Sequence, residues 1–336
     1  MEDMYSILDA IRPGMTGGVL ATVIRVDGSA YKKEGAAMFF KPDGTRIGLL
    51  SAGCLEEDLA ARIENGFGRK PETIVYDMRR DDDLSWGTGS GCNGAVHVYV
   101  EPVGRRYAAH LLRLKTFLQS GTAVTGIKFP DSGAYLFVTE DGHRFGSYQG
   151  EMGFVHYLPV KNGTFFLPVM QEEVYIHHYR PKPRFILFGA GKDAAPLAAL
   201  AAKTGFSVIV SDWRPGLCSR QNFPDAEELV VGFPSEVFAE SRITIAPNDF
   251  VMIMTHHFSR DQEILTHVMQ TNPRYLGVLG SMKRTKRLLG MEKLPPGIRT
   301  PAGLAIAAEG PEEIAVSIIA ECIKLKNEPV SEEVLL

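Results

Sequence analysis

The sequence predicts an α/β protein in which a mixed α+β domain is followed by a doubly wound parallel sheet. Three observations support this fold class: a length of 336 residues, which suggests two domains; a proline-containing break at YRPKPRF; and a change of pattern after that break. From there on, apolar strands alternate with helices, which is typical of a parallel sheet covered by helices on both faces. We expect an N-terminal domain over residues 1–178, a linker over 179–184 and a C-terminal domain over 185–330.

The composition excludes several classes of protein. Hydrophobic residues make up 45% of the chain, charged residues 23%, and the net charge is −4, so the strongly basic face of a nucleic-acid binder is not expected. No stretch approaches the roughly 20 apolar residues of a membrane span, and the acidic N-terminus does not resemble a secretory signal. Four cysteines are too few for a disulfide framework. We expect a cytoplasmic protein that binds neither nucleic acid nor membrane, with a homodimer as the default oligomer.

The N-terminal domain is expected to begin with a short amphipathic helix over residues 4–12, ended by Pro13 and Gly14. The β-branched run over residues 17–26 predicts a buried strand. A Pro-Asp-Gly turn then joins AAMFF to RIGLL in a hairpin, because glycine supplies the positive φ of such a turn. Further helices are expected in LEEDLAARIENGFG and RYAAHLLRLKTFLQSG, and further strands in ETIVYDM, AVHVYVEPV and short runs up to about residue 178.

Two cysteines of this domain lie in glycine-rich turns. Gly53 precedes Cys54 in SAGCLEED, and Gly91 and Gly94 flank Cys92 in GTGSGCNG. Glycine lets the backbone approach a ligand closely, and a thiol near helix-start amides can become a thiolate that attacks or ligates a metal. The alternative is that both cysteines are small buried hydrophobic residues.

A third glycine-bounded loop, DGSAYKKEGAAM, carries Lys32 and Lys33. Two cations beside exposed backbone amides suit a phosphate group, including the phosphate of a pterin. The alternative is an exposed lysine pair without a ligand. The sequence leaves open whether this loop and the two cysteine turns converge on one cleft.

The C-terminal domain begins with a glycine pattern typical of dinucleotide-binding folds. Gly189 and Gly191 lie in FGAGKDA, after an apolar strand and before an alanine-rich helix. Asp212 ends the next strand, about twenty residues on, where an acid meets a ribose hydroxyl. The pattern predicts a Rossmann-like domain. Binding of NAD(P) or another nucleotide is a separate hypothesis, because a Rossmann fold can need these glycines only for its turn.

Two later loops of this domain also follow apolar strands. His256 in MTHHFSRD could hold an anion or a metal, or could stabilise its own loop. Gly280 and Ser281 open a helix in GVLGSMKRTKRLL, an arrangement suited to cradling phosphate. The alternative for the second loop is a solvated basic face.

Together these motifs resemble the XdhC/CoxI family, the accessory factors of xanthine dehydrogenase and related molybdenum hydroxylases. The resemblance runs through nearly the whole chain and is carried by GSAYKKEGAAM, SAGCLE, GCNGAVHVYVEP, FGAGKDA, SDWRP, THHFSRD, GVLGS and PEEIAVSIIAE. It implies a chaperone that binds molybdenum cofactor (molybdopterin), protects it while its terminal sulfur is installed, and delivers it to an apo molybdenum hydroxylase.

This resemblance gives the candidate residues definite roles. Cys54 and Cys92 would be soft metal ligands or sulfur-relay thiols facing molybdenum, and the loop with Lys32 and Lys33 would hold the pterin phosphate. The expected partner is the apo-hydroxylase, with a cysteine desulfurase as a further candidate. The resemblance implies a carrier role that does not require an enzyme activity, and no catalytic residues are assigned. Two other classes remain open: an NAD(P)-dependent oxidoreductase or nucleotide sensor, and an interaction scaffold with purely structural glycine turns.

Overall fold

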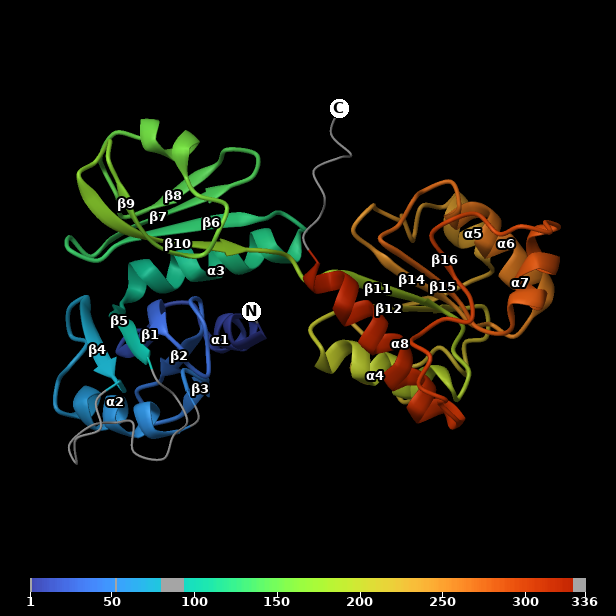
Figure 1. Cartoon of the computed structure of the whole chain (residues 1–336), viewed down its shortest axis with the longest axis horizontal. Coiled ribbons are helices and arrows are strands. Elements are labelled where there is room, and N and C mark those ends of the chain that lie inside the picture. Colours follow the sequence, from blue (N-terminus) through green and yellow to red (C-terminus); the bar gives the residue numbers. More distant parts are fainter. Residues whose placement is uncertain (1, 52, 80–93, 329–336) are drawn as a thin grey trace. The chain divides into compact units, whose positions relative to one another are not determined.

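The structure is a computed structural model, and it describes residues 2–51, 53–79 and 94–328. The chain forms two compact units, and the boundary between them lies between Pro181 and Lys182. Figure 1 shows two antiparallel sheets in the N-terminal unit and a parallel sheet with its helices in the C-terminal unit. No helix in the described part of the chain is long and apolar enough to cross a membrane.

The first sheet of the N-terminal unit is antiparallel, with the strand order β3-β2-β1-β5-β4. Its central strand β1 is buried over its first seven residues, as its β-branched sequence predicts. Helices α1 and α2 belong to the same part of the chain. The elements are α1 (Glu2–Ala10), β1 (Gly18–Gly28), β2 (Ala37–Phe40), β3 (Arg46–Gly48), α2 (Cys54–Glu64), β4 (Glu72–Asp77) and β5 (Gly94–Val103).

A second antiparallel sheet follows, with the strand order β8-β7-β6-β10-β9. Helix α3 lies between the two sheets (Figure 1), and its buried residues recur every three or four positions, as on one face of a helix. The elements are α3 (Arg105–Gln119), β6 (Val124–Phe129), β7 (Ala134–Thr139), β8 (Arg144–Gly146), η1 (Gly153–Tyr157), β9 (Gly163–Leu167) and β10 (Glu172–Tyr179).

The two sheets enclose a buried ion pair. Lys128 on β6 contacts the carboxylate of Glu101 on β5, and each side chain is 4% exposed. Tyr107 donates a hydrogen bond to the same carboxylate over 2.9 Å, and Lys128 donates to Thr22 on β1 over 3.3 Å. The buried hydroxyl of Tyr99, whose ring lies 5.5 Å from the ammonium of Lys128, has no hydrogen-bond partner in the described structure.

The C-terminal unit has a parallel sheet with the strand order β13-β12-β11-β14-β15-β16. This order reverses between β11 and β14 and is that of a Rossmann fold, which confirms the predicted fold class. The strands and helices are β11 (Arg184–Phe188), α4 (Ala194–Lys203), β12 (Ser207–Asp212), β13 (Glu228–Val231), α5 (Pro234–Ala239), β14 (Phe250–Ile253), α6 (Phe258–Val268), β15 (Tyr275–Val278), α7 (Met282–Leu289), β16 (Ile298–Arg299) and α8 (Gly310–Asn327).

Helices cover both faces of this sheet (Figure 1). Apolar residues of α4 and α8 pack on one face, and those of α5, α6 and α7 pack on the other. Ligands of open α/β sheets bind outside the carboxyl ends of the strands, at the point where the strand order reverses. In this fold, a ligand site is therefore expected at the loops that follow β11 and β14.

Candidate functional site

Several connections of the N-terminal unit leave its first sheet at one end, which we call the loop end. Gly28, the last residue of β1, lies opposite Gly94, the first residue of β5. Asp77, the last residue of β4, lies opposite Ala95. Strand β3 runs toward the same end of the sheet, and its last residue pairs with Met38, which lies opposite Ala21 in β1, seven residues before Gly28. The antiparallel pairing thus brings segments that are distant in sequence to the same end of the sheet.

Two of the three glycine-containing segments that the sequence indicated leave the first sheet toward the loop end. Loop 29–36, with Lys32 and Lys33, joins β1 to β2, and the turn 49–53 leads from β3 into α2 at Cys54. Lys33 is exposed, whereas Lys32 is partly buried. Both segments therefore leave the sheet toward the same end, and their convergence on one cleft stays a prediction.

The third segment lies outside the described residues. The chain leaves the sheet after β4 and returns at Gly94, so both ends of this connection are at the loop end, and Met78 donates its amide to the Gly94 carbonyl. A Cβ atom at Gly94 would lie 2.6 Å from the carbonyl oxygen of Ser29, so glycine is required there. Cys92 and Gly91 belong to the part that is not described, and their roles stay predictions.

The turn before Cys54 takes its shape from glycine. Gly53 has a φ of 128°, a conformation that residues with side chains rarely adopt, and no atom lies within 4 Å of the position its Cβ would occupy. Gly53 is also the residue before the first turn of α2, whose opening amide groups favour negative charge. The backbone beside Cys54 therefore faces open space at a helix start.

Glu56 holds this turn in place. Its carboxylate accepts hydrogen bonds from the amides of Leu50 (3.0 Å), Ser51 (2.6 Å) and Gly53 (3.1 Å), and from the Ser51 hydroxyl. Four donors fill the roughly four acceptor positions of a carboxylate. Burial acts to raise the pKa of Glu56, but the hydrogen bonds from Ser51 and the backbone outweigh it, so the pKa is lowered. All acceptor positions of the Glu56 carboxylate are thus used to hold the segment that precedes Cys54.

We expect Glu56→Gln to lower the free energy of unfolding by about 1–3 kcal/mol at neutral pH, because an amide nitrogen would face backbone donors in a buried site. The folded-state pKa of Glu56 is below its ordinary value of 4.5. The stabilisation is therefore complete above that pH and is lost as the pH falls through the folded-state pKa. Denaturant unfolding at neutral and acidic pH measures the difference, which should shrink in acid.

Glu57→Gln is the matched control for this prediction. Glu57 lies beside Glu56 in the first turn of α2, but its side chain is 76% exposed and pairs with Arg46 at the surface, so its replacement should change stability little. Equal losses in the two variants, or a Glu56→Gln deficit that persists unchanged in acid, would contradict the assigned role.

A polar cluster at the loop end was not predicted from the sequence. Asp27 at the end of β1 lies 2.9 Å from Arg25 and 3.0 Å from the His97 ring nitrogen on β5. The hydrogen bond from Arg25 is the main reason that the pKa of Asp27 is lowered. Arg79 donates three hydrogen bonds to Asp77 nearby on β4, one from its amide and two from its guanidinium. A histidine inside the apolar strand AVHVYV was the signal that could have indicated this cluster.

In the C-terminal unit, the glycine turn lies against the end of β14. Gly189 has a φ of 117°, and a Cβ there would lie 2.5 Å from the carbonyl oxygen of Met254. Its amide donates to Ser211 on the neighbouring strand. Gly191 has no such backbone neighbour, and a Cβ there would meet only the carboxylate of Asp193. Gly189 is therefore required by strand packing, whereas Gly191 leaves backbone exposed.

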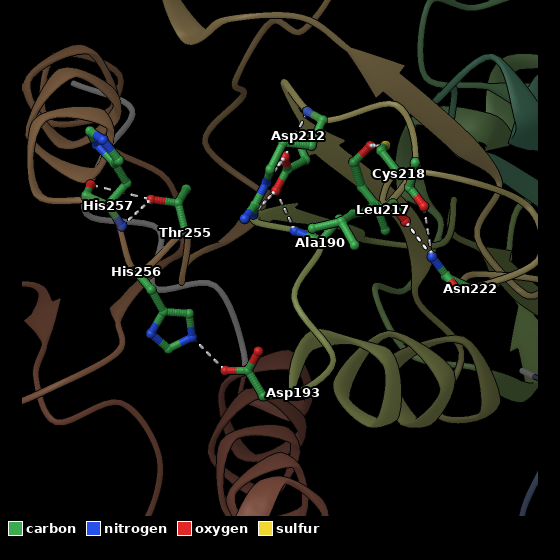
Figure 2. A network of polar contacts seen from close by, with 12 residues as sticks. Ala190, Asp193, Asp212, Leu217, Cys218, Asn222, Thr255, His256 and His257 are labelled. Atoms are coloured by element: carbon green, nitrogen blue, oxygen red, sulfur yellow. Dashed lines mark hydrogen bonds and ion pairs between the residues drawn. The ribbon is translucent and has the colours of Figure 1, made fainter.

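The acid predicted to meet a ribose hydroxyl is buried and fully paired. Figure 2 shows Asp212 beside Ala190, whose amide donates to it over 2.8 Å. Arg214 donates three further hydrogen bonds of 2.7–2.9 Å to the same carboxylate, from its amide and its guanidinium. Burial acts to raise the pKa of Asp212, but these hydrogen bonds outweigh it and the pKa is lowered. No acceptor position of the carboxylate is left over.

His256 follows β14, and the glycine turn follows β11, so the two loops lie on either side of the point where the strand order reverses. Figure 2 shows its ring directed at Asp193, the residue before α4, and the two side chains are 2.6 Å apart. His256 adopts a φ of 59°, which is uncommon outside glycine. The contact joins the segment after β14 to the start of α4, and it places the Asp193 carboxylate over Gly191. The structure thus gives His256 a loop-stabilising contact, and its role toward a ligand stays a prediction.

Gly280 and Ser281 lie at the start of α7, as predicted. Gly280 has a φ of 113°, and the Ser281 hydroxyl caps the helix by accepting from the amide of Arg284. The guanidinium of Arg284 donates to Asp261, which also accepts from Thr255. These contacts show a helix cap, while phosphate binding by this turn stays a prediction.

The structure also bears on metal ligands. Among the side chains that it describes, no group of three or more His, Cys, Asp or Glu residues is arranged to hold a metal ion. Cys218 and Cys322 are buried free thiols within the C-terminal core. The side chain of Cys54 and the whole of Cys92 are not described, so a metal site built on these two residues stays a prediction.

The fold and its sites define a class of protein: a Rossmann-type unit joined to a two-sheet unit that gathers glycine turns at one end. Family comparisons agree with this division. Residues 15–77 match the XdhC and CoxI family, residues 105–180 match the BH1974-like central domain, and residues 185–322 match the XdhC Rossmann domain.

The chain belongs to the XdhC and CoxI family. It is 45% identical over 335 residues to a Bacillus subtilis protein named as a probable subunit of xanthine dehydrogenase, covering 97% of this chain and 98% of that protein. It is 24% identical to PaoD of Escherichia coli, named a molybdenum cofactor insertion chaperone, over 92% of this chain and 84% of PaoD. A Bacillus halodurans crystal structure, described as a xanthine dehydrogenase, has a TM-score of 0.86 and 42% identity and covers 99% of this chain and 98% of that chain.

Proposed function

We propose that the protein binds molybdenum cofactor, protects it, and delivers it to a xanthine dehydrogenase-type molybdenum hydroxylase. The observation that carries the proposal is the pairing of the first sheet, which directs the lysine loop and the chain leading to Cys54 toward the same end. The names of the Bacillus subtilis and Escherichia coli relatives support an accessory role in the maturation of such an enzyme.

The residues at the loop end suit this group. A molybdenum cofactor brings a sulfur-coordinated metal and an anionic phosphate on a pterin. Cys54, the first residue of α2, would supply a soft donor, and open space lies over the position that a Gly53 Cβ would occupy. Lys32 and Lys33 would face the phosphate. Cys92 would act as a second thiol, as a ligand or in sulfur transfer.

The proposal extends to partners. An apo molybdenum hydroxylase receives the cofactor, and a cysteine desulfurase supplies the sulfur that completes it. The proposal assumes that the protein acts as a homodimer in the cytoplasm. The protein itself acts as a carrier, so its effect is measured on the activity of the enzyme it supplies.

A binding titration of the full chain with molybdenum cofactor tests the proposal. We expect tight binding by the unmodified protein and a loss of about tenfold or more in Cys54→Ala or Cys92→Ala, because a metal–thiolate contact is removed. Cys218→Ala is the matched control, since Cys218 is buried in the core of the C-terminal unit.

NAD⁺ is titrated in parallel. Failure of the cofactor to bind, or equal binding by all three cysteine variants, overturns the carrier function assigned to the loop end. Binding of NAD⁺ without binding of the cofactor would instead favour an NAD(P)-dependent oxidoreductase or a nucleotide sensor built on the Rossmann unit.

A further inference from the structure

We propose that the carboxyl edge of the Rossmann sheet binds a nucleotide through a phosphate on its ribose, with Arg214 as the residue that determines this specificity. The inference concerns the C-terminal unit alone and does not depend on cofactor binding at the loop end. It rests on the way in which Asp212, Arg214 and Trp213 are arranged.

Asp212 is closed to a ribose hydroxyl. An acid at this position recognises an unphosphorylated ribose by accepting hydrogen bonds from its hydroxyl groups. Here four protein donors already occupy the carboxylate, and a carboxylate has about four acceptor positions. A ribose hydroxyl would have to displace a charge-assisted hydrogen bond from Arg214, which would be replaced only by a neutral and weaker one.

Arg214 carries the positive charge and the hydrogen-bond donors that a ribose phosphate requires. Two of its guanidinium nitrogens donate to Asp212, and its remaining N–H groups have no partner in the described structure. The side chain is 40% exposed, and its guanidinium carbon lies 4.5 Å from the centre of the Trp213 ring. Asp212 and Trp213 therefore hold the fork in place, while part of the side chain stays exposed to solvent. An arginine near this strand end is the group that accommodates a ribose phosphate in Rossmann folds.

The charges around this edge favour an anion. Asp212 is paired with Arg214, and Asp193 shares a hydrogen bond with the ring of His256. Lys192, in the turn between β11 and α4, is exposed. Arg214 and Lys192 thus place two cationic groups at the glycine turn and the end of β12, as a phosphate-binding edge requires.

Titration calorimetry on the full chain tests the proposal with adenosine 2′,5′-bisphosphate and adenosine 5′-monophosphate. These probes differ by the ribose phosphate alone, and they lack the second half of a dinucleotide, so the Asp193 carboxylate over Gly191 affects both in a similar way. We expect the bisphosphate to bind about tenfold more tightly or better, as expected for one added charge-assisted interaction. Inorganic phosphate is the third probe and should bind much more weakly than the bisphosphate.

Arg214→Gln should remove the preference for the bisphosphate. Lys203→Gln is the matched control, because it removes one positive charge at the last turn of α4, the far end of that helix from the glycine turn. Arg214→Lys keeps the charge without the fork and should retain only part of the preference. If Arg214→Gln fails to fold, the comparison of the two nucleotides on the unmodified protein still decides the result.

Trp213 reports where the ligand binds. The chain has two tryptophans, so Trp86→Phe leaves Trp213 as the emitter, and the bisphosphate should change its fluorescence. Equal affinity for the two nucleotides, no binding of either, or binding of inorganic phosphate as tightly as the bisphosphate overturns the proposal. Binding that leaves the Trp213 emission unchanged, or that is unaffected in Arg214→Gln, also overturns it.

Discussion

Lys128→Met is expected to lower the free energy of unfolding of the N-terminal unit by about 3–5 kcal/mol, because it leaves the carboxylate of Glu101 buried and unpaired. Both side chains of the ion pair are 4% exposed, so water cannot replace the lost partner. Tyr107 alone would still donate to Glu101. Calorimetry of the full chain measures the loss, since the two units can unfold in separate transitions.

The double variant Lys128→Met with Glu101→Leu is the control for this prediction. Replacing both members of a buried ion pair by apolar residues is often neutral or stabilising, because neither charge then has to be removed from water. We therefore expect the double variant to recover most of the stability lost in the single one. A single variant as stable as the unmodified protein, or a double variant that is worse than the single one, would show that the pair contributes differently.

Gly189→Ala is expected to destabilise the C-terminal unit by roughly 3 kcal/mol or more, from the combined cost of a strained backbone and a steric clash. Gly189 has a φ of 117°, and the added Cβ would lie 2.5 Å from the Met254 carbonyl oxygen and 2.7 Å from its carbon. Both atoms belong to backbone next to β14, so they can move away only if neighbouring strands separate. Thermal unfolding of the full chain measures the loss.

Gly191→Ala is the matched control in the same turn. Its added Cβ would approach only the side chain of Asp193, which can rotate away, so the change in stability should stay within about 1 kcal/mol. The pair of variants separates a glycine needed for folding from one that leaves room for a ligand. If Gly191→Ala proved the more damaging, strand packing could not be the reason for the glycine at position 189.

The regular alternation of strands and helices after residue 180 was enough to predict the Rossmann unit, because most of its parallel strands are connected to the next through a helix close in sequence. The N-terminal unit was less predictable. Its strands pair across distances such as Gly28 with Gly94, and short strands with similar patterns do not specify which partner they take. The separation into two sheets with α3 between them therefore emerged only from the structure.

The same limit applies to the sites. The sequence indicated Asp212 by its position at a strand end, but the pattern gave no means of counting the donors around it. Arg214, two residues later, fills that carboxylate and becomes the group that faces outward. Likewise, Glu56 was a residue near Cys54 in the sequence, and the structure shows it as the acceptor that organises the whole turn.

The loop end also bears on how such a protein can change over time. The positions at which its segments leave the sheet are set by main-chain pairing of the strands, and the turn before α2 is held in addition by the Glu56 carboxylate. Substitutions at loop positions that make no such contact can therefore accumulate without altering strand register. Relatives can in this way keep the same sheet while differing in these segments, and, under the proposed function, exchanging single segments between relatives tests which segment selects the enzyme that is supplied.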